Sequence, residues 1–250
     1  TYAEIPYDII YDEEVITGKL PLYDWLHLHH EDFTGQYGKF YAMYHTAAWY
    51  QEQVRTDETM ARKLGFEKVS QMKGAVARRI KEFTAGGGFM FSMCSGTDSY
   101  DISLAVEGID ICEKMYDGDG TTSNYNSKLD FSKTVAFRDF KLSVNPMEYE
   151  FSDIDMTIQR KIPKNEDVFV LFEFSAKWDP VPSMLCQNHT QVVKGFMGQT
   201  PSFKKDLIKP EVLVMGENKA ANEARYIHGE TGKGTWTFYG GHDPEDYQHM

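Results

Sequence analysis

The spacing of apolar side chains predicts a helix and then a buried strand in the first half of the chain. Apolar residues recur at helical spacing between positions 69 and 83: Val69, Met72, Val76, Ile80 and Phe83. Such a stripe is typical of a helix with one face against a core, and Gly86 is a suitable stop. The run Phe89–Met93 is apolar without alternation, as in strands buried on both faces. We predict that it is a central parallel strand.

Other apolar segments extend this alternation of helix and strand. We predict strands at residues 5–11, 23–30, 168–175 and 211–215, helical structure at 40–64, and a helix from about Tyr100. A Gly-Lys-Gly turn joins runs 224–228 and 235–239 into a hairpin. The order favours an α/β protein with a three-layer, mainly parallel, doubly wound sheet. Because such a sheet normally has another strand before Ile5, we expect the first strand to lie outside residues 1–250.

Residues 117–164 differ in character from their surroundings. A polar loop starts at Asp117, and short alternating stretches follow at 134–137 and 155–159. We interpret 117–164 as a β-rich insertion within one α/β domain that spans residues 1–250.

Cys94 ends the predicted central strand and is the first candidate functional residue. Ser92 and Gly96 flank it, and small residues at these positions allow a sharp turn from strand into helix, as in the nucleophile elbow of serine hydrolases. A thiol at a helix N-terminus lies at the positive end of the helix dipole, which favours the thiolate. The alternative is a small buried residue that ends a core strand.

His242 follows the last predicted strand and supplies the second half of the candidate site. Gly240 and Gly241 end that strand, and Glu245 is close behind His242. A cysteine, a histidine and a carboxylate are the nucleophile, base and orienting group of a covalent hydrolase. We predict that Cys94, His242 and Glu245 form a catalytic triad. The alternative for His242 is a loop histidine that caps a strand.

The two segments together resemble the class I glutamine amidotransferase-like superfamily, which has a flavodoxin-like α/β fold. There a Gly-x-Cys-x-Gly elbow carries the nucleophile, and a His-Pro-Glu signature supplies the base and its acid. Cys94 and Gly96 match the elbow, whereas Ser92 stands where the family usually has glycine. His242 matches the signature, but Asp243 is inserted after it, so either Glu245 or Asp243 faces the imidazole.

Two narrower resemblances are also present. Residues 232–242 resemble the end of ThuA-like domains, a branch of the superfamily whose members often lack the cysteine. The whole chain resembles a bacterial family often labelled asparagine synthetase B-like. Asparagine synthetases of that type carry an ATP-pyrophosphatase loop, Ser-Gly-Gly-x-Asp-Ser, and the stretch from Ser95 to Ser99 is one residue short of it. Since a missing residue changes the loop that would wrap a phosphate, we expect no ATP. We also predict no other cofactor.

The resemblance implies a cysteine-dependent glutaminase or amidohydrolase that acts on a small-molecule amide. The backbone N–H groups of Ser95 and of the Gly35 region would then form the oxyanion hole. The alternative from another class is a non-catalytic domain that binds a carbohydrate or metabolite, as expected of the ThuA-like branch.

His27 and His29 alternate along the strand predicted at 23–30 and share one face. With Glu31 or Asp32, or with His242, they could bind zinc or iron in a two-histidine, one-carboxylate type of site. Alternatively, they could line the amidotransferase-like pocket. No ligand spacing supports the metal, and we predict none.

Composition limits the kinds of partner and the cellular compartment that we expect for this protein. The net charge of −12 argues against nucleic acid and anionic membrane surfaces, and no apolar run reaches the 18 or so residues of a membrane span. The 3 cysteines show no framework spacing, which favours a reducing, cytoplasmic compartment over a disulfide scaffold.

Overall fold

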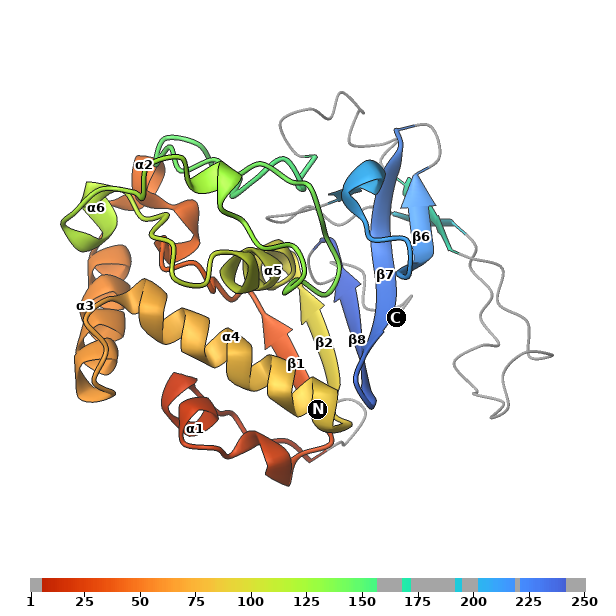
Figure 1. Ribbon diagram of the computed structural model, residues 1–250, viewed down its shortest axis with the longest axis horizontal. Helices are drawn as coiled ribbons and strands as arrows, with labels where there is room; N and C mark the ends of the chain where they lie inside the picture. Colours follow the sequence, from red (N-terminus) through yellow and green to blue (C-terminus); the bar gives the residue numbers. More distant parts are fainter. Residues whose placement is uncertain (1–5, 157–167, 172–191, 195–201, 219–220, 242–250) are drawn as a thin grey trace.

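The computed structural model describes residues 6–156, 168–171, 192–194, 202–218 and 221–241 (Figure 1). The helices in this part of the chain are α1 (Asp12–Ile16), α2 (Tyr41–Tyr44), α3 (Ala48–Lys63), α4 (Val69–Gly86), α5 (Asp98–Ala105) and α6 (Lys114–Asp117). Its strands are β1 (Trp25–His29), β2 (Phe89–Met93), β3 (Val168–Leu171), β4 (Val192–Lys194), β5 (Phe203–Lys204), β6 (Leu213–Asn218), β7 (Glu223–Thr231) and β8 (Gly234–Tyr239). Short 3₁₀ turns include η1 (Leu20–Leu22), η2 (Tyr37–Lys39), η3 (Cys94–Gly96), η4 (Tyr125–Ser127) and η7 (Lys205–Leu207).

The strands form one mixed sheet in the order β1-β2-β8-β7-β6-β3-β4, with β5 paired to β7. β2 pairs in parallel with both β1 and β8, so the prediction of a central parallel strand is confirmed. β7, β6, β3 and β4 continue the sheet with antiparallel pairings. The α/β class is therefore confirmed, whereas the mainly parallel, three-layer, flavodoxin-like arrangement is not.

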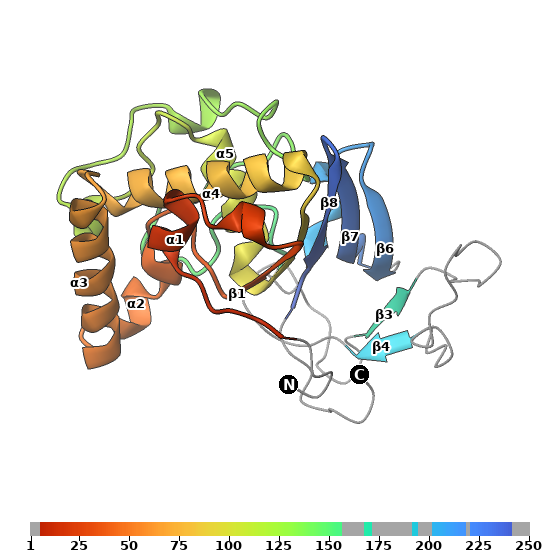
Figure 2. The same ribbon diagram turned by 90° about the horizontal axis from the view of Figure 1, so that it is seen from below.

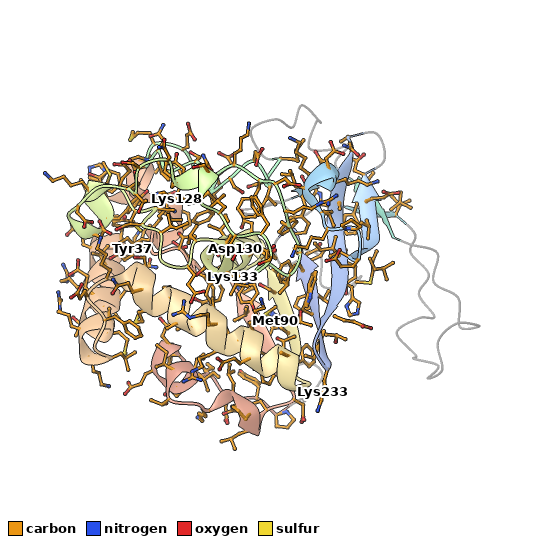
Figure 3. The ribbon with its side chains drawn as sticks, viewed as in Figure 1. Tyr37, Met90, Lys128, Asp130, Lys133 and Lys233 are labelled. Carbon is orange, nitrogen blue, oxygen red and sulfur yellow. The ribbon has the colours of Figure 1, made fainter. Side chains whose placement is uncertain are left out.

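Helices α1, α4 and α5 lie on one face of the parallel strands (Figures 1 and 2). Leu26 and Leu28 on β1 and Met90 on β2 point into the core on this face, and Met90 lies between β2 and α4 (Figure 3). The side chains that alternate with them on β1 are exposed: Trp25, His27 and His29. The alternation along β1 thus separates a helix-covered face from a face with exposed aromatic rings.

Helix α4 confirms the predicted helix, and its C-terminal end fixes the position of the predicted hairpin. Gly87 caps α4 with a φ of +124°, a conformation that favours glycine. The backbone N–H of Lys233, in the β7–β8 turn (Figure 3), donates to the Ala85 carbonyl at 3.0 Å. A Cβ at Gly234 would lie 2.1 Å from the Thr84 carbonyl oxygen, so only glycine lets the turn approach α4 this closely. This contact places β8 beside β2.

Other predictions have mixed outcomes. The strands predicted at 23–30, 168–175 and 211–215 correspond to β1, β3 and β6, and the helical stretch 40–64 is divided into α2 and α3. Residues 6–11 contain no strand.

In the region interpreted as an insertion, residues 118–156 contain η4 and isolated β-bridges, such as Leu142 with Ser152, and residues 157–164 lie outside the described residues. The buried Asp101 carboxylate on α5 holds this region by accepting the backbone N–H groups of Val135, Ala136 and Phe137 at 2.7–2.8 Å. Within the described residues, no helix combines the length and the apolar character that crossing a bilayer requires.

Candidate active site

The three parallel strands end at the same edge of the sheet, and the candidate site lies there. His29 on β1 is paired with Met93 on β2, which is paired with Tyr239 on β8. The next residue along each strand therefore belongs to one row across the sheet: His30, Cys94 and Gly240. Carboxyl ends of parallel strands are a usual position for ligand sites in α/β proteins.

Cys94 occupies a sharp turn between β2 and helix. Its φ is +55°, in the left-handed region, while Met93 before it is extended. The N–H and the hydroxyl of Thr97 donate to the Cys94 carbonyl at 3.2 and 2.7 Å and hold the turn. A left-handed conformation costs an L-residue other than glycine about 1–2 kcal/mol, and such strain is concentrated at functional sites.

The residues on either side of Cys94 explain the small-residue pattern. A Cβ at Gly96 would lie 2.8 Å from Ser92 Oγ and 3.7 Å from the backbone nitrogen of Glu31. Ser92 is completely buried on the helix-covered side of β2. The elbow therefore tolerates serine at the position where the resembling family has glycine, and it leaves little room at position 96.

His30 contacts the Cys94 thiol directly. Nδ1 of His30 lies 3.1 Å from Cys94 Sγ, although the two residues are 64 positions apart in the sequence. His30 is itself left-handed, with a φ of +58°, and its exposed ring lies edge-on to that of His29 at 4.0 Å. A cysteine and a histidine at hydrogen-bond distance are the minimal pair for thiolate formation.

Sequence reasoning selected His27 and His29 and missed His30. The His27 ring packs on Phe91 at 5.1 Å and faces away from the helix-covered side of the sheet. His29 lies on the same face and reaches the site through its contact with His30. The usable signal was the row across the sheet, because His30 is the first residue after β1 just as Cys94 is the first after β2.

Backbone donors are present at the elbow. Ser95 and Gly96 belong to the first turn after β2, and the first N–H groups of a helical turn have no acceptor within that turn. From the loop after β1, Glu31 lies beside Gly96. Gly35 of the same loop lies against the start of α4, where its Cβ would be 2.7 Å from the Ser70 nitrogen.

Tyr149 is influenced electrostatically by the Cys94 thiol and by two carboxyl groups. Burial raises the pKa of Tyr149, and the negative charges that Cys94, Asp155 and Glu150 can carry raise it further. The side chains of Glu150 and Asp155 are 5% and 3% exposed. The pKa of Tyr149 therefore depends on charge at the thiol and at two buried carboxyl groups.

A buried lysine ties the loop after β1 to the segment around Ser143 and Asn145. Lys39 is 1% exposed, and its Nζ donates to the carbonyls of Ser143 and Asn145 at 3.0 and 2.9 Å. Burial lowers the pKa of Lys39 to about 8. Through this contact, the loop that starts at His30 holds the segment that leads to Tyr149.

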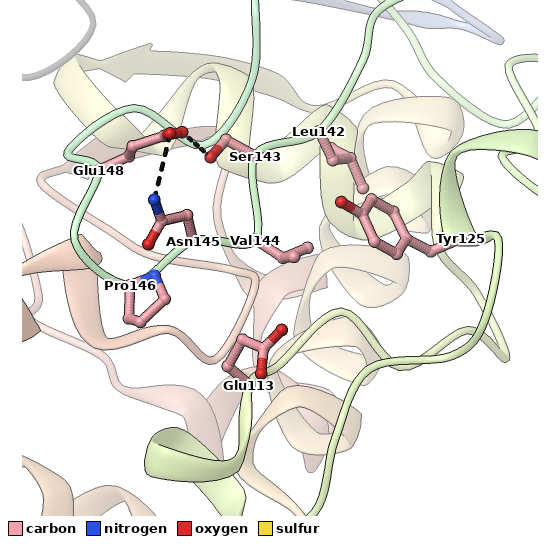
Figure 4. A pocket seen from close by; sticks show the side chains of 8 residues that line it. All are labelled: Glu113, Tyr125, Leu142, Ser143, Val144, Asn145, Pro146 and Glu148. Atoms are coloured by element: carbon pink, nitrogen blue, oxygen red, sulfur yellow. Dashed lines mark hydrogen bonds between the residues drawn. The ribbon is translucent and has the colours of Figure 1, made fainter.

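The loop held by Lys39 also borders an open hollow of about 540 Å³ (Figure 4). Its lining residues are Glu113, Tyr125, Leu142, Ser143, Val144, Asn145, Pro146 and Glu148. Neither Cys94 nor His30 lines it, so we assign it no part in the site.

A second titratable cluster lies near α6. Ligand atoms of Asp110, Cys112 and Asp117 lie within 4.8 Å of one another. The Lys68 ammonium contacts both carboxylates, at 3.1 Å from Asp117, and so already supplies their counter-charge. Burial, followed by the charges of Asp117 and Asp110, raises the pKa of the Cys112 thiol, so this cysteine is poorly suited to nucleophilic chemistry.

The remaining predicted residues, His242, Asp243 and Glu245, lie outside the described residues. His242 directly follows Gly241, which is the last described residue after β8. The strand that leads to it ends at the same edge as Cys94.

Comparison with known proteins identifies no family. No protein-family model matches the chain, and no curated protein matches it. Among solved structures, Cytoplasmic Protein STM3548 from Salmonella typhimurium is 9% identical with a TM-score of 0.43, over 98% of this chain and 74% of that one.

Proposed function

We propose that the protein is a cysteine-dependent amide hydrolase of the amidotransferase-like type, with Cys94 as nucleophile and His30 as general base. One observation carries the proposal: His30 Nδ1 lies 3.1 Å from the sulfur of a cysteine held in a left-handed strand-to-helix turn. The resemblance of the elbow to that of flavodoxin-like amidotransferases supports the same reading.

The proposed reaction proceeds in two steps. His30 accepts the thiol proton, and the sulfur attacks the amide carbonyl carbon to give a tetrahedral intermediate. The N–H groups of Ser95 and Gly96 stabilise its oxyanion. The C–N bond breaks as the imidazolium returns the proton to the leaving amine, which leaves a thioester. Water, deprotonated by the same imidazole, then hydrolyses the thioester to a carboxylic acid and restores the thiol.

The resemblance assigns the base to His242, with Glu245 or Asp243 as its acid, whereas the observed contact favours His30. The two assignments are separable by mutation. Asparagine is the best replacement for His30, because asparagine tolerates the left-handed backbone but cannot act as a base. His30→Asn should reduce kcat at least about 100-fold if His30 is the base, and His242→Asn should do so if the signature histidine is.

The decisive experiment measures ammonia release from glutamine and other primary amides. We expect turnover by the wild type, and none by Cys94→Ala with its circular dichroism unchanged. His228→Asn is the matched control for the histidine variants. His228 lies on β7, and its Nδ1 is 2.9 Å from the Thr237 hydroxyl on β8, so its ring is not part of the elbow. Undiminished turnover by Cys94→Ala would refute the proposal. Absence of turnover of every amide by the wild type would favour the non-catalytic carbohydrate- or metabolite-binding alternative.

A further inference from the structure

The two turns that carry His30 and Cys94 lie against each other along their backbones. A Cβ at Gly96 would lie 3.7 Å from the Glu31 nitrogen, so the elbow approaches the loop after β1 at the residue that follows His30. Figure 1 shows helix α5 beside the ends of β1 and β2, where both turns leave the sheet. The distance between the imidazole and the thiol therefore depends on what holds these two turns together.

Ser99, in the first turn of α5, contacts both turns through one hydroxyl group. Its Oγ donates to the Ser95 carbonyl at 2.5 Å, and the Glu31 carbonyl oxygen is a second acceptor at 3.2 Å. These two carbonyls belong to the residues that directly follow Cys94 and His30. The hydroxyl therefore lies between the backbone next to the nucleophile and the backbone next to the proposed base.

Helix formation alone does not account for the contacts of Ser99. A serine hydroxyl in a helix commonly donates to the carbonyl four residues before it, which explains the bond to Ser95. The Phe33 N–H, which donates to Ser99 Oγ at 3.3 Å, and the Glu31 carbonyl are 66 and 68 positions away in the sequence. Ser99 is completely buried, so its hydroxyl serves these protein groups rather than solvent.

Removal of this hydroxyl changes the forces between the two turns. The carbonyl oxygens of Ser95 and Glu31 both lie within hydrogen-bond distance of it, and without its proton their like partial charges repel each other. The Phe33 N–H also loses its acceptor. Both effects favour a movement of the loop after β1 away from the elbow, which lengthens the 3.1 Å contact between the imidazole and the thiol.

We propose that Ser99 is a positioning residue: its hydroxyl holds the loop after β1 against the elbow and so keeps the His30 imidazole in contact with the Cys94 thiol. The inference rests on the proposed function for its effect on turnover, whereas the contact itself can be measured without a substrate. The stretch from Ser95 to Ser99, one residue short of a phosphate loop, thus uses its last side chain for bonds within the protein.

The test measures how the rate of Cys94 alkylation by iodoacetamide, followed by peptide mass, depends on pH. The midpoint of this profile reports the thiol pKa, whereas access of the reagent sets only the plateau at high pH. Because an imidazolium in contact with a thiol lowers its pKa, Ser99→Ala should raise the midpoint by about one pH unit and slow labelling at neutral pH about tenfold. Alanine removes only the hydroxyl and suits a helix, so circular dichroism should be unchanged.

Ser103→Ala is the matched control, because Ser103 is also a buried serine on α5, but its Oγ faces Gly74 on α4. We expect this variant to keep the wild-type midpoint. An unchanged midpoint in Ser99→Ala, or an equal shift in Ser103→Ala, would overturn the inference.

A double-mutant cycle shows whether Ser99 acts through His30. His30→Asn should raise the midpoint as well, and Ser99→Ala should raise it no further in that background. Three other titratable groups near the pair, His29, Glu31 and Tyr149, are present in all four proteins and so do not produce the difference. A full shift from Ser99→Ala in the His30→Asn background would contradict the proposed role.

Turnover separates this inference from the proposed function. In ammonia release from glutamine, Ser99→Ala should lower kcat at least about tenfold and leave KM unchanged, because Ser99 is completely buried and acts only through the base. A shifted labelling midpoint, with no amide turned over by the wild type, refutes the hydrolase but keeps Ser99 as the residue that holds His30 against Cys94. Turnover that Ser99→Ala leaves unchanged refutes the inference but keeps the hydrolase.

Discussion

The left-handed backbone at Cys94 makes a quantitative prediction about stability. Replacement by glycine relieves the strain, whereas replacement by alanine keeps it, because only glycine lacks the Cβ that causes it. Both replacements remove the sulfur. The buried Cys112 is the matched site: both cysteines are 1% exposed, but Cys112 has no positive φ.

The magnitude follows from three contributions. Glycine in place of alanine costs about 0.5–1 kcal/mol in chain entropy. Loss of a buried methyl group costs about 0.8 kcal/mol more. At Cys112 these add, so we expect Cys112→Gly to be about 1–2 kcal/mol less stable than Cys112→Ala. At Cys94, relief of about 1–2 kcal/mol of left-handed strain offsets them, and the glycine and alanine variants should be nearly equal in stability.

Urea unfolding of the four variants, followed by circular dichroism, measures this difference. The glycine penalty at position 112 should exceed that at position 94 by about 1–2 kcal/mol, with unchanged m-values. Equal differences between the glycine and alanine variants at the two positions would refute the claim that the Cys94 backbone is strained. They would also refute the strained turn as the basis of the elbow.

Three further predictions concern the groups around the site. Iodoacetamide at neutral pH should label Cys94 faster than Cys112, whose thiol pKa is raised by burial and by Asp117, and faster than Cys186; equal, slow labelling would mean that Cys94 is only a core residue. Asp101→Asn should leave at least one of the N–H groups that donate to Asp101 buried without an acceptor, which lowers the free energy of unfolding by about 1–3 kcal/mol. An unchanged urea midpoint would contradict this. Burial lowers the pKa of Lys39 from 10.5 to about 8, so the unfolded chain binds this proton more tightly than the folded chain does. As the pH rises from about 8 to 10.5, the free energy of unfolding of the wild type should therefore increase by up to about 3 kcal/mol relative to that of Lys39→Met. A difference between the two proteins in urea unfolding that does not change with pH would refute this.

Local patterns were sufficient for the elements around the elbow. The helical stripe from Val69 to Phe83 predicts α4, and the unbroken apolar run predicts β2 as a strand with parallel neighbours. The hairpin followed from a Gly-Lys-Gly turn, and the close approach of Gly234 to Thr84 shows why glycine is needed there. In these places backbone conformation, packing and residue type agree.

Pairing between distant segments was less predictable. The order of helices and strands predicts parallel pairing, and it gives no indication of the antiparallel pairings of β6 with β7 and of β3 with β6. A strand was predicted at residues 5–11 from their composition, but residues 6–11 form none. Strand-like composition produces a strand only where a partner strand is available.

His30 illustrates why the site was only partly predictable. Period-2 alternation selects His27 and His29, and the resemblance selects His242, but His30 follows neither pattern. Only its left-handed turn brings the ring to Cys94, and nothing in the sequence His-Glu-Asp encodes that φ value.

The distribution of backbone strain favours function over packing as the reason for this arrangement. Among the described residues, those other than glycine with positive φ are His30, Tyr37, Lys39, Cys94, Asn124, Asp139 and Asn222. Asparagine, aspartate and histidine occur in this conformation more often than other residues, and the remaining three, Tyr37, Lys39 and Cys94, lie in the loop after β1 or at the elbow after β2. At about 1–2 kcal/mol each, these three carry about 3–6 kcal/mol of strain, which is a sizeable part of the roughly 5–15 kcal/mol that stabilises a typical domain. Glycine would make the same turns without that cost, as Gly35 and Gly38 do nearby. Here the backbone turns carry side chains instead, and they place an imidazole nitrogen 3.1 Å from a thiol sulfur. The chemistry of this pair explains the choice of residues better than packing does.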